Sequence, residues 1–122
     1  MKKILYIEDD AAVAEVVLEI LEFENYDVIT DSGRFMHQHL KKEHIGLVLI
    51  DEGLSWCWGS DLCREIKDNN ATAHIPVIMI SSANEIDRIA AKCGADTYIR
   101  KPFDMYDVID TVNQYYREPG KP

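Results

Sequence analysis

The sequence predicts an α/β domain in which five parallel strands form one doubly wound sheet with helices on both faces. Two observations support this prediction: five short runs rich in Ile, Val and Leu, and the amphipathic stretches that alternate with them. Strands of a parallel sheet are covered on both faces and therefore tend to be apolar throughout. The intervening helices act as right-handed crossovers between parallel strands.

The first strand is predicted at residues 4–7 and leads into a helix over residues 12–24. Asp10 precedes this helix at the position of an N-cap, which favours a capping role over a metal-binding one. The apolar side chains that recur at helical spacing are Val13, Val16, Val17, Ile20 and Leu21.

The later elements repeat this βα succession. Gly94 is placed to end the fourth helix as its C-cap, and Asp104 to begin the fifth as its N-cap. Further strands are predicted at residues 27–30, 47–50, 77–80 and 97–99, and further helices at residues 34–42, 60–67, 85–93 and 105–116.

The length and composition suit one domain. A hydrophobic fraction of 47% in 122 residues is ample for a single core, which we assign to residues 1–117. Residues 118–122 are rich in Pro and Gly and are predicted to be a frayed tail or the start of a linker. A net charge of -9 argues against direct binding to nucleic acid or to an anionic membrane.

The cysteines and the apolar runs indicate a cytoplasmic location. Cys57, Cys63 and Cys93 are an odd, widely spaced set, which favours reduced thiols in small apolar positions over a disulfide framework. The apolar runs are far shorter than the roughly 20 residues that a membrane-spanning helix needs.

Polar side chains follow every predicted strand. Because a doubly wound sheet binds its ligand beyond the carboxyl ends of the strands, these side chains form the candidate site. They are Glu8, Asp9 and Asp10, then Asp31 and Ser32, then Asp51, then Ser81 and Ser82, and finally Lys101.

This set of side chains suits phosphoryl chemistry with a metal. Carboxylates gathered at one edge repel each other unless a cation neutralises them, and oxygen ligands favour Mg²⁺. An ionised carboxylate such as Asp51 is a competent nucleophile, while Ser81 and Lys101 can meet the oxygens of a transferred phosphoryl group. Each residue also has a plainer interpretation: a capping aspartate, a turn hydroxyl and a solvated surface charge.

Four motifs carry a resemblance to a known family. ILYIEDD, VLIDEG, PVIMISS and YIRKPF, in this order, resemble the receiver domain of two-component response regulators over residues 3–116. The resemblance implies a flavodoxin-like (βα)5 fold with the strand order 2-1-3-4-5 seen in the chemotaxis member.

The same resemblance implies roles for individual residues. Asp51 would accept a phosphoryl group from a sensor histidine kinase or a phosphotransfer protein. Glu8, Asp9, Asp51 and the backbone carbonyl of Gly53 would hold Mg²⁺. Ser81 and Lys101 would each contact a phosphoryl oxygen, and the Lys101–Pro102 bond would be cis.

The resemblance also implies a switch. Phosphorylation of Asp51 would draw the loops that carry Ser81 and Lys101 inward and change the affinity of the face formed by the fourth helix, the fifth strand and the fifth helix for its partner. That partner is a downstream protein or an output domain, and the chain is expected to be a monomer or a weak phosphorylation-dependent dimer. Tyr98 matches the switch aromatic, or is an ordinary tyrosine of the core or sheet edge. Gly53 and Ala83 cannot orient a hydrolytic water, which predicts an intermediate to long aspartyl-phosphate lifetime.

One loop departs from the family pattern. After Asp51 the family usually has an apolar residue followed by Pro-Gly, whereas here Leu54 is followed by Ser-Trp-Cys-Trp-Gly. Trp56 and Trp58 are candidates either for a partner contact or for cover over the third helix. Glu52 is expected to point to the opposite face of the sheet, away from the metal site.

The four histidines are predicted to lie on the surface away from the site, because they are too scattered for zinc. They are His37, His39, His44 and His74.

Two other functions remain open from the sequence. A degenerate receiver would keep the fold as a phosphorylation-independent interaction module. The missing proline and the Trp pair favour it slightly, and the complete set of Glu8, Asp9, Asp51, Ser81 and Lys101 disfavours it. A flavodoxin-like electron carrier would need a cradle of backbone N–H groups for the flavin phosphate, and the acids at residues 8–10 oppose one.

Overall fold

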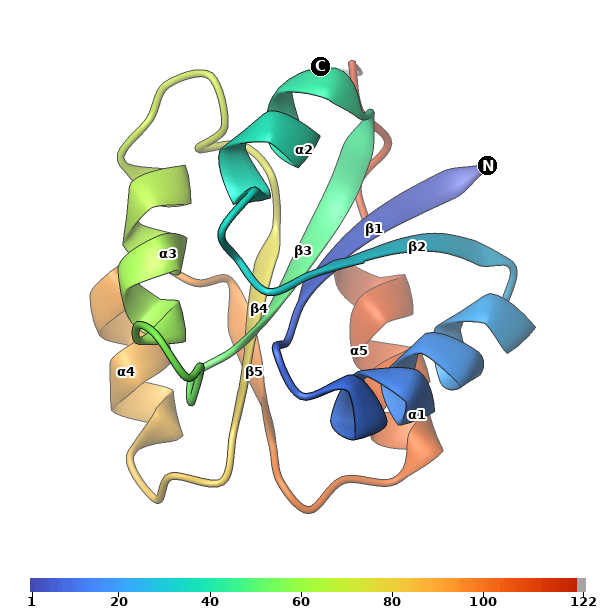
Figure 1. Ribbon diagram of the computed structural model, residues 1–122, viewed down its shortest axis with the longest axis vertical. Helices are drawn as coiled ribbons and strands as arrows, with labels where there is room; N and C mark the ends of the chain where they lie inside the picture. The colour runs from blue at the N-terminus through green and yellow to red at the C-terminus, as the bar shows by residue number, and fades with distance from the viewer. Residues whose placement is uncertain (121–122) are drawn as a thin grey trace.

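The alternation of apolar and amphipathic segments becomes a regular βα succession in the computed structural model, which describes residues 1–120 (Figure 1). All ten predicted elements are present, with ends that differ from the predictions by a few residues. The strands are β1 (Lys2–Ile7), β2 (Tyr26–Asp31), β3 (Ile45–Asp51), β4 (Val77–Ser81) and β5 (Thr97–Arg100). The helices are α1 (Ala11–Phe23), α2 (Met36–Lys42), α3 (Gly59–Lys67), α4 (Ile86–Cys93) and α5 (Met105–Tyr115).

The five strands form one parallel sheet in the order β2-β1-β3-β4-β5, which confirms the predicted topology. The chain builds outward from β1 to β2, then crosses back to β3 and continues to β5. The strand order therefore reverses between β1 and β3, and the loops that leave these two strands border the crevice where such sheets bind ligands.

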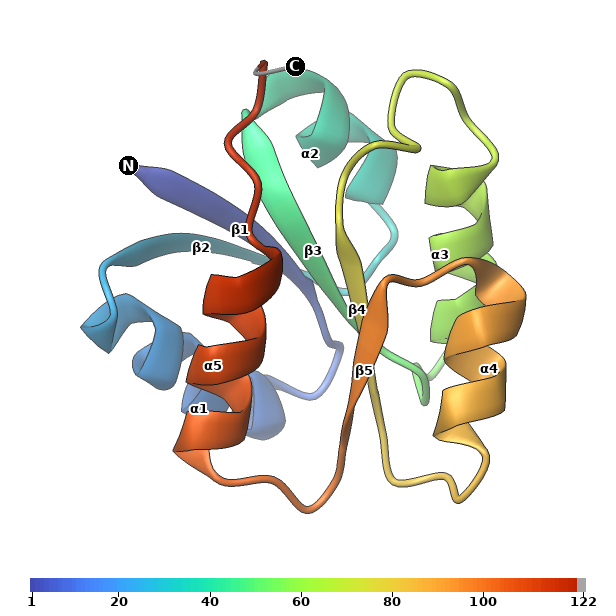
Figure 2. The same cartoon turned by 180° about the vertical axis from the view of Figure 1, so that it is seen from behind.

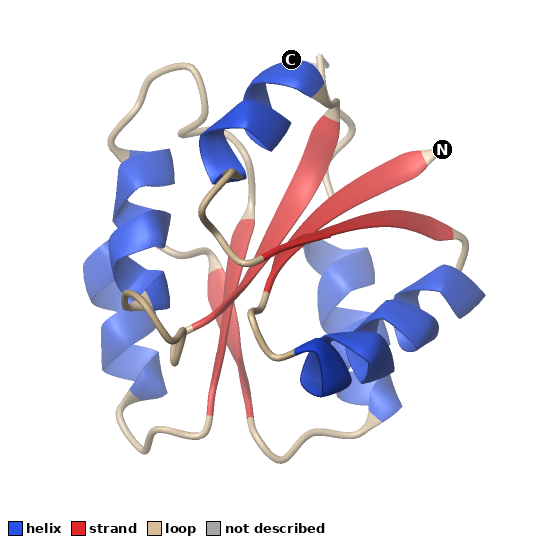
Figure 3. Ribbon diagram, in the orientation of Figure 1, coloured by secondary structure: helices blue, strands red, loops and turns tan. Residues whose placement is uncertain are grey.

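Helices cover both faces of the sheet, as Figures 2 and 3 show. Helices α1 and α5 lie on one face, where Val17, Leu21 and Val108 pack against the strands. Helices α2, α3 and α4 lie on the other, and Cys63 and Cys93 are buried there among aliphatic side chains. The three cysteines are free thiols, and Cys57 is half-buried, as the sequence predicts.

The predicted helix caps are present. Asp10 accepts hydrogen bonds from the N–H groups of Ala12 and Val13, and Asp104 forms a capping box with Asp107. Gly94 ends α4 in the left-handed conformation, with φ of 82°.

Two details of the helices differ from the prediction. Helix α2 begins at Met36 rather than at residue 34, because the Asp31 carboxylate accepts the N–H groups of Gly33 and Phe35 and holds them in a turn. Val16, expected on the apolar face of α1, is 55% exposed.

The end of the chain returns to the start of the sheet. The N–H of Arg117 donates to the carbonyl of Gly46 at 3.1 Å, and the Tyr116 hydroxyl accepts the N–H of Lys3 at 3.1 Å. The predicted tail at residues 118–122 stays a prediction, and residues 121–122 lie outside the described part of the chain. Within residues 1–120, no helix is long and apolar enough to cross a membrane.

Candidate functional site

The candidate site lies at the carboxyl ends of the strands, on both sides of the switch point. Asp51 and Ser81 are the last residues of β3 and β4, and Glu8 and Lys101 follow β1 and β5 directly. Backbone hydrogen bonds fix these positions across the sheet. The N–H of Glu8 donates to the backbone carbonyl of Asp31 at 3.0 Å, and the N–H of Lys101 donates to the backbone carbonyl of Ser81 at 2.9 Å.

Asp51 is a nearly buried carboxylate, 5% exposed, at the centre of this edge. Its Oδ1 accepts a hydrogen bond from Lys101 Nζ at 2.8 Å, and the two groups form an ion pair. Its Oδ2 lies on the side of Gly53, 3.8 Å from the point where a Cβ of residue 53 would stand. One oxygen therefore meets a fixed cation, while the other faces the loop that follows the strand.

Glu8 is also buried, and its pKa is raised. Burial is the main cause, and the charge of Asp51 adds to it. The N–H of Asp10 donates to the Glu8 carboxylate at 3.3 Å and opposes this shift. The charge of Asp51 therefore disfavours ionisation of Glu8.

Asp9 has a different environment. It is only half-buried, and hydrogen bonds from the hydroxyl and the backbone N–H of Ser55 lower its pKa. Ser55 lies 46 residues further along the chain, so this contact joins the loop after β1 to the loop after β3.

The donors fit a hard divalent cation. No three Asp, Glu, His or Cys side chains within residues 1–120 are gathered as a ready set of metal ligands. Glu8 and Asp51 nevertheless carry a repulsion at close quarters, since the charge of Asp51 raises the pKa of Glu8. A cation between them would relieve it, and carboxylate and carbonyl oxygens are the ligands that Mg²⁺ prefers.

Ser81 is the last residue of β4 and leads into the loop between β4 and α4. Its side chain is buried, and its hydroxyl accepts the N–H of Ala83 at 3.0 Å. Arg100 holds the same loop from the next strand, because its guanidinium donates to the carbonyls of Ala83 and Asn84 at 3.0 and 3.1 Å. Tyr98 lies on the outer side of this contact, with the Arg100 guanidinium 5.7 Å from its ring centre.

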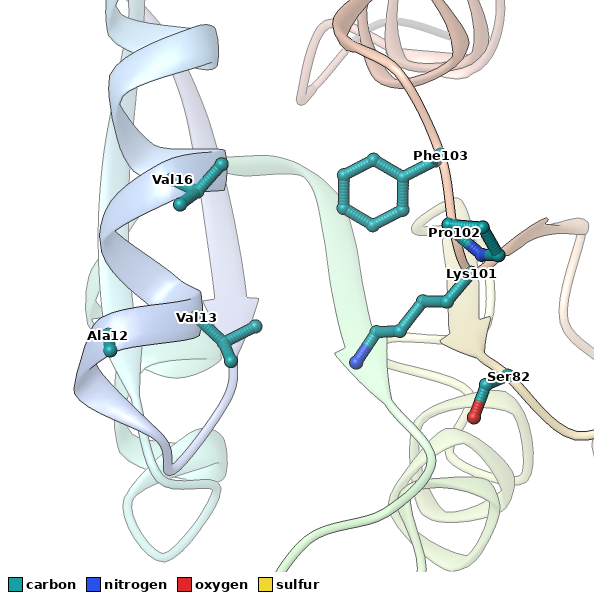
Figure 4. A pocket seen from close by; sticks show the side chains of 7 residues that line it. All are labelled: Ala12, Val13, Val16, Ser82, Lys101, Pro102 and Phe103. Carbon is teal, nitrogen blue, oxygen red and sulfur yellow. The ribbon is translucent and has the colours of Figure 1, made fainter.

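An open apolar groove of about 550 Å³ runs beside Lys101 (Figure 4). Val16 of α1 and the ring of Phe103 face each other across it, and the Lys101 side chain extends past them toward the end of β3. The Lys101–Pro102 bond is cis, as predicted. The groove is lined by Ala12, Val13, Val16, Ser82, Lys101, Pro102 and Phe103.

The two tryptophans of the loop after Asp51 lie in different environments. Trp56 packs against the loop between β2 and α2, where its indole N–H donates to the carbonyl of Ser32 at 2.9 Å and the Arg34 guanidinium lies 4.6 Å from its ring centre. Trp58 is 63% exposed and does not cover α3. Glu52 points away from the metal site as expected, and its carboxylate accepts the N–H of Ser60 at the start of α3.

The prediction for the histidines is wrong for one of them. His37, His44 and His74 are exposed, but His39 is half-buried and its Nε2 lies 3.5 Å from Asp31 Oδ1 at the end of β2. Asp31 itself holds the turn that precedes α2 and contacts His39.

Three contacts at this edge were not predicted from the sequence: Ser55 to Asp9, Trp56 to Ser32, and Arg100 to the loop after β4. Each uses a backbone N–H or carbonyl, and every non-proline residue carries both, so residue type gives no signal. The missing proline is the one sequence feature that bears on them, since only a non-proline residue can donate at position 55.

The fold and the site define a doubly wound α/β domain of the flavodoxin-like class, with an acidic site and a lysine at its switch point. Residues 4–113 match the response regulator receiver domain family, and the chain belongs to that family. It is thus a regulatory receiver domain of two-component signalling rather than an enzyme in the ordinary sense, and its membership decides against an electron carrier.

Three relatives illustrate the similarity. The chain is 34% identical to the response regulator ArlR of Staphylococcus saprophyticus, over 99% of this chain and 56% of that protein. It is 32% identical to the DNA-binding dual master transcriptional regulator RpaA of Synechocystis, over 99% of this chain and 52% of that protein. The chain therefore spans about half the length of these two relatives.

The third relative is a solved structure, the receiver domain of the sensor histidine kinase PA1611 of Pseudomonas aeruginosa PAO1. It superimposes with a TM-score of 0.83 at 22% identity, over 93% of this chain and 96% of that one. That structure is described as having a magnesium ion coordinated in its active site cleft.

Proposed function

We propose that this domain is a phosphorylation-dependent switch in which Asp51 accepts a phosphoryl group from a sensor histidine kinase or a phosphotransfer protein. The single observation that carries the proposal is the nearly buried Asp51 carboxylate, held at the switch point by Lys101 Nζ at 2.8 Å beside a second buried carboxylate, Glu8. An ion pair alone would not need a further acid at the same place, whereas a site for a metal and a phosphoryl group does.

The residues divide the work of phosphoryl transfer. An oxygen of Asp51 attacks phosphorus as the bond to the donor's nitrogen breaks, and the bonding pair leaves with that nitrogen. The Lys101 ammonium meets one phosphoryl oxygen and the Ser81 hydroxyl donates to another, which supports the developing charge without covalent chemistry. Mg²⁺, held by Glu8, Asp9, Asp51 and the carbonyl of Gly53, would supply charge neutralisation at the remaining oxygen.

Phosphorylation would change the surface through the loop after β4. Once Ser81 donates to the phosphoryl group, its hydroxyl turns and the loop it begins moves inward. Arg100 ties that loop to β5, so the movement would reach Tyr98 and the face formed by α4, β5 and α5. We propose that a downstream protein or an output domain reads this face.

The experiment that tests the proposal is phosphorylation by acetyl phosphate and Mg²⁺, read by intact-protein mass spectrometry. A gain of one phosphoryl group is expected in the native chain and none in Asp51→Asn, while Glu19→Gln on the exposed side of α1 should behave as the native chain does. Absence of any gain in the native chain would favour the alternative, a degenerate receiver that binds partners regardless of phosphorylation. The exposed Trp58 supports that alternative.

Addition of Mg²⁺ and beryllofluoride tests the switch itself. Backbone chemical shifts should change on α4, β5 and α5 as well as around Asp51. Changes confined to the loops around Asp51 would leave the switch face without support.

Other parts of the proposal follow from the same site. Gly53 and Ala83 carry no side chain that could orient a hydrolytic water, so the aspartyl phosphate should persist well beyond seconds without a phosphatase.

We propose a cytoplasmic monomer that forms at most a weak dimer on phosphorylation. The net charge of -9 argues against nucleic-acid contacts by this chain itself, although RpaA, one of its longer relatives, is a DNA-binding regulator.

A further inference from the structure

The loop between β3 and α3 is closed on itself at its base. Gly53 and Trp58 form an isolated antiparallel bridge, and the N–H of Gly59 donates to the carbonyl of Glu52 at 2.9 Å. Residues 54–57 therefore form a small lobe next to Asp51, with Leu54 buried in the core at its base and Cys57 packed against the same core. The orientation of this lobe depends on what holds its tip.

Trp56 anchors the tip to the neighbouring loop. Its indole N–H donates to the carbonyl of Ser32, and its ring lies against Gly33, where a Cβ would stand only 3.2 Å from Cζ2. The Arg34 guanidinium lies on the ring, 4.6 Å from its centre. The lobe is thus held by a hydrogen bond, a tight packing contact and a cation–π contact, all to the loop between β2 and α2.

The anchored lobe presents Ser55 to the candidate metal site, including a backbone donor that does not depend on its side chain. The N–H of Ser55 donates to Asp9 Oδ2. Asp9 is only half-buried, so its carboxylate would otherwise be free to turn toward solvent. Proline, which the family usually carries after the apolar residue of this loop, has no N–H and could not make this contact.

We propose that Ser55 is a positioning residue whose backbone N–H orients Asp9 for the metal, and that Trp56 holds Ser55 in place. The inference rests on the proposed function, since it concerns the same magnesium site. A carboxylate has lone pairs on two oxygens, so Asp9 can accept the N–H at Oδ2 and offer Oδ1 to a cation. Hydrogen bonds to ligating carboxylates fix their orientation, and their loss typically weakens metal binding by roughly 10-fold to 100-fold.

The test compares Ser55→Pro with Ser55→Ala, which keeps the N–H and loses only the hydroxyl. Mg²⁺ titrated into each metal-free protein, with calorimetry as the readout, should give a dissociation constant roughly 10-fold higher for the Pro variant than for the Ala variant. Equal constants would overturn the inference. A lower constant for the Pro variant would overturn it too, because it would mean that the N–H competes with the metal for Asp9.

A second variant decides the matter if Ser55→Pro does not fold. Trp56→Phe keeps an aromatic ring at this position but removes the donor to Ser32 and the part of the indole that lies against Gly33. It should weaken Mg²⁺ binding and speed hydrogen exchange at the Ser55 amide by a few-fold, and unchanged values of both would overturn the inference. If the native chain itself binds no Mg²⁺, the proposed function fails; if it binds Mg²⁺ and the variants bind equally well, only the role of Ser55 fails.

Discussion

At the scale of single residues, the charges of Asp51 and Lys101 compensate each other. The Asp51 carboxylate is nearly removed from water, and Lys101 Nζ is its cationic partner at 2.8 Å. Removing one member of such a pair leaves a poorly solvated charge without compensation, which costs more than the pair contributes.

Lys101→Met should therefore lower the free energy of unfolding by about 1–3 kcal/mol in metal-free buffer. Asp51→Asn removes the charge that Lys101 offsets. In the Asp51→Asn background, Lys101→Met should therefore lower the free energy of unfolding much less. Urea unfolding of the four proteins in this double-mutant cycle measures the coupling. Additive effects would mean that the ion pair contributes nothing to stability.

Glu8 shows the opposite relation between charge and stability. Because the folded protein raises its pKa, ionised Glu8 destabilises the fold as the pH rises through that pKa, and the penalty is absent at lower pH. Glu8→Gln should raise the midpoint of thermal unfolding at neutral pH without metal, by about 4 °C if the gain is about 1 kcal/mol. The difference from the native chain should vanish in acid.

The same variant should bind Mg²⁺ more weakly, since it loses a charged ligand. Glu19→Gln, which removes one charge from the exposed side of α1, is the matched control and should change neither property. A Glu8→Gln protein less stable than the native chain at neutral pH would contradict the argument.

At the scale of elements, the turn from β3 into α3 has to pass very close to Asp51. A Cβ at Gly59 would contact the carbonyl oxygen of Asp51 and would lie 2.8 Å from Ile50 Cγ2. Backbone cannot give way as a flexible side chain can, so this position requires glycine on steric grounds alone.

Gly59→Ala should lower the free energy of unfolding by about 2 kcal/mol or more and displace Asp51. Gly53→Ala, whose Cβ would have 3.8 Å to its nearest neighbour, should stay within about 0.5 kcal/mol of the native chain. Thermal unfolding compares the two, and equal stabilities would show that the turn can relax.

The contact between β5 and the loop after β4 is a second element-scale feature. Arg100→Met keeps the aliphatic stem and removes the donors to Ala83 and Asn84. Losing about 1 kcal/mol of local stability corresponds to roughly fivefold faster amide hydrogen exchange in residues 82–85. Arg88→Met, on the exposed side of α4, is the control; exchange equal in both variants would show that Arg100 does not hold the loop.

These elements also mark how far the sequence could be interpreted. Apolar alternation predicted all ten elements, and the rule that ligands bind at strand ends brought Asp51 and Lys101 together before any contact was known. Where Glu8 lies relative to Asp51 follows from the same rule. The start of α2 was missed because the Asp31 carboxylate caps a turn there, and His39 was misplaced with it.

The loop contacts could not have been predicted for a different reason. The contacts made by Ser55, Trp56 and Arg100 each include a backbone N–H or carbonyl. The direction of such a group depends on the loop conformation, which is set by contacts between segments distant in the sequence.

At the scale of the whole molecule, the acidic site lies at the opposite end of the strands from Lys2 and Arg117. Lys2 begins β1, and Arg117 bonds to Gly46 at the start of β3, whereas Asp51 ends that strand (Figure 1). A segment that continues from Arg117 thus starts far from Asp51 and leaves the carboxyl ends of the strands uncovered.

The net charge of -9 makes the response to cations a property of the entire chain. Any salt should stabilise the fold somewhat by screening self-repulsion. Mg²⁺ that binds the folded chain alone would add a gain that grows with the logarithm of its free concentration and reaches about 2.7 kcal/mol at about 100 times the dissociation constant. Unfolding measured at constant ionic strength separates the two effects.

The magnesium-specific gain should be reversed by EDTA and reduced in Asp9→Asn. An equal response to NaCl and MgCl₂ at matched ionic strength would mean that screening alone is at work.

The two tryptophans of this chain, Trp56 and Trp58, both stand in the loop beside Asp51, and Trp56 carries the Arg34 guanidinium on its ring. The tryptophan fluorescence of the unlabelled protein therefore comes from one place, within a few residues of Asp51. Any event that shifts this loop, such as binding of a cation, a phosphoryl group or a partner, would alter the colour or intensity of that light. Tryptophan fluorescence would thus report such events in real time without a dye.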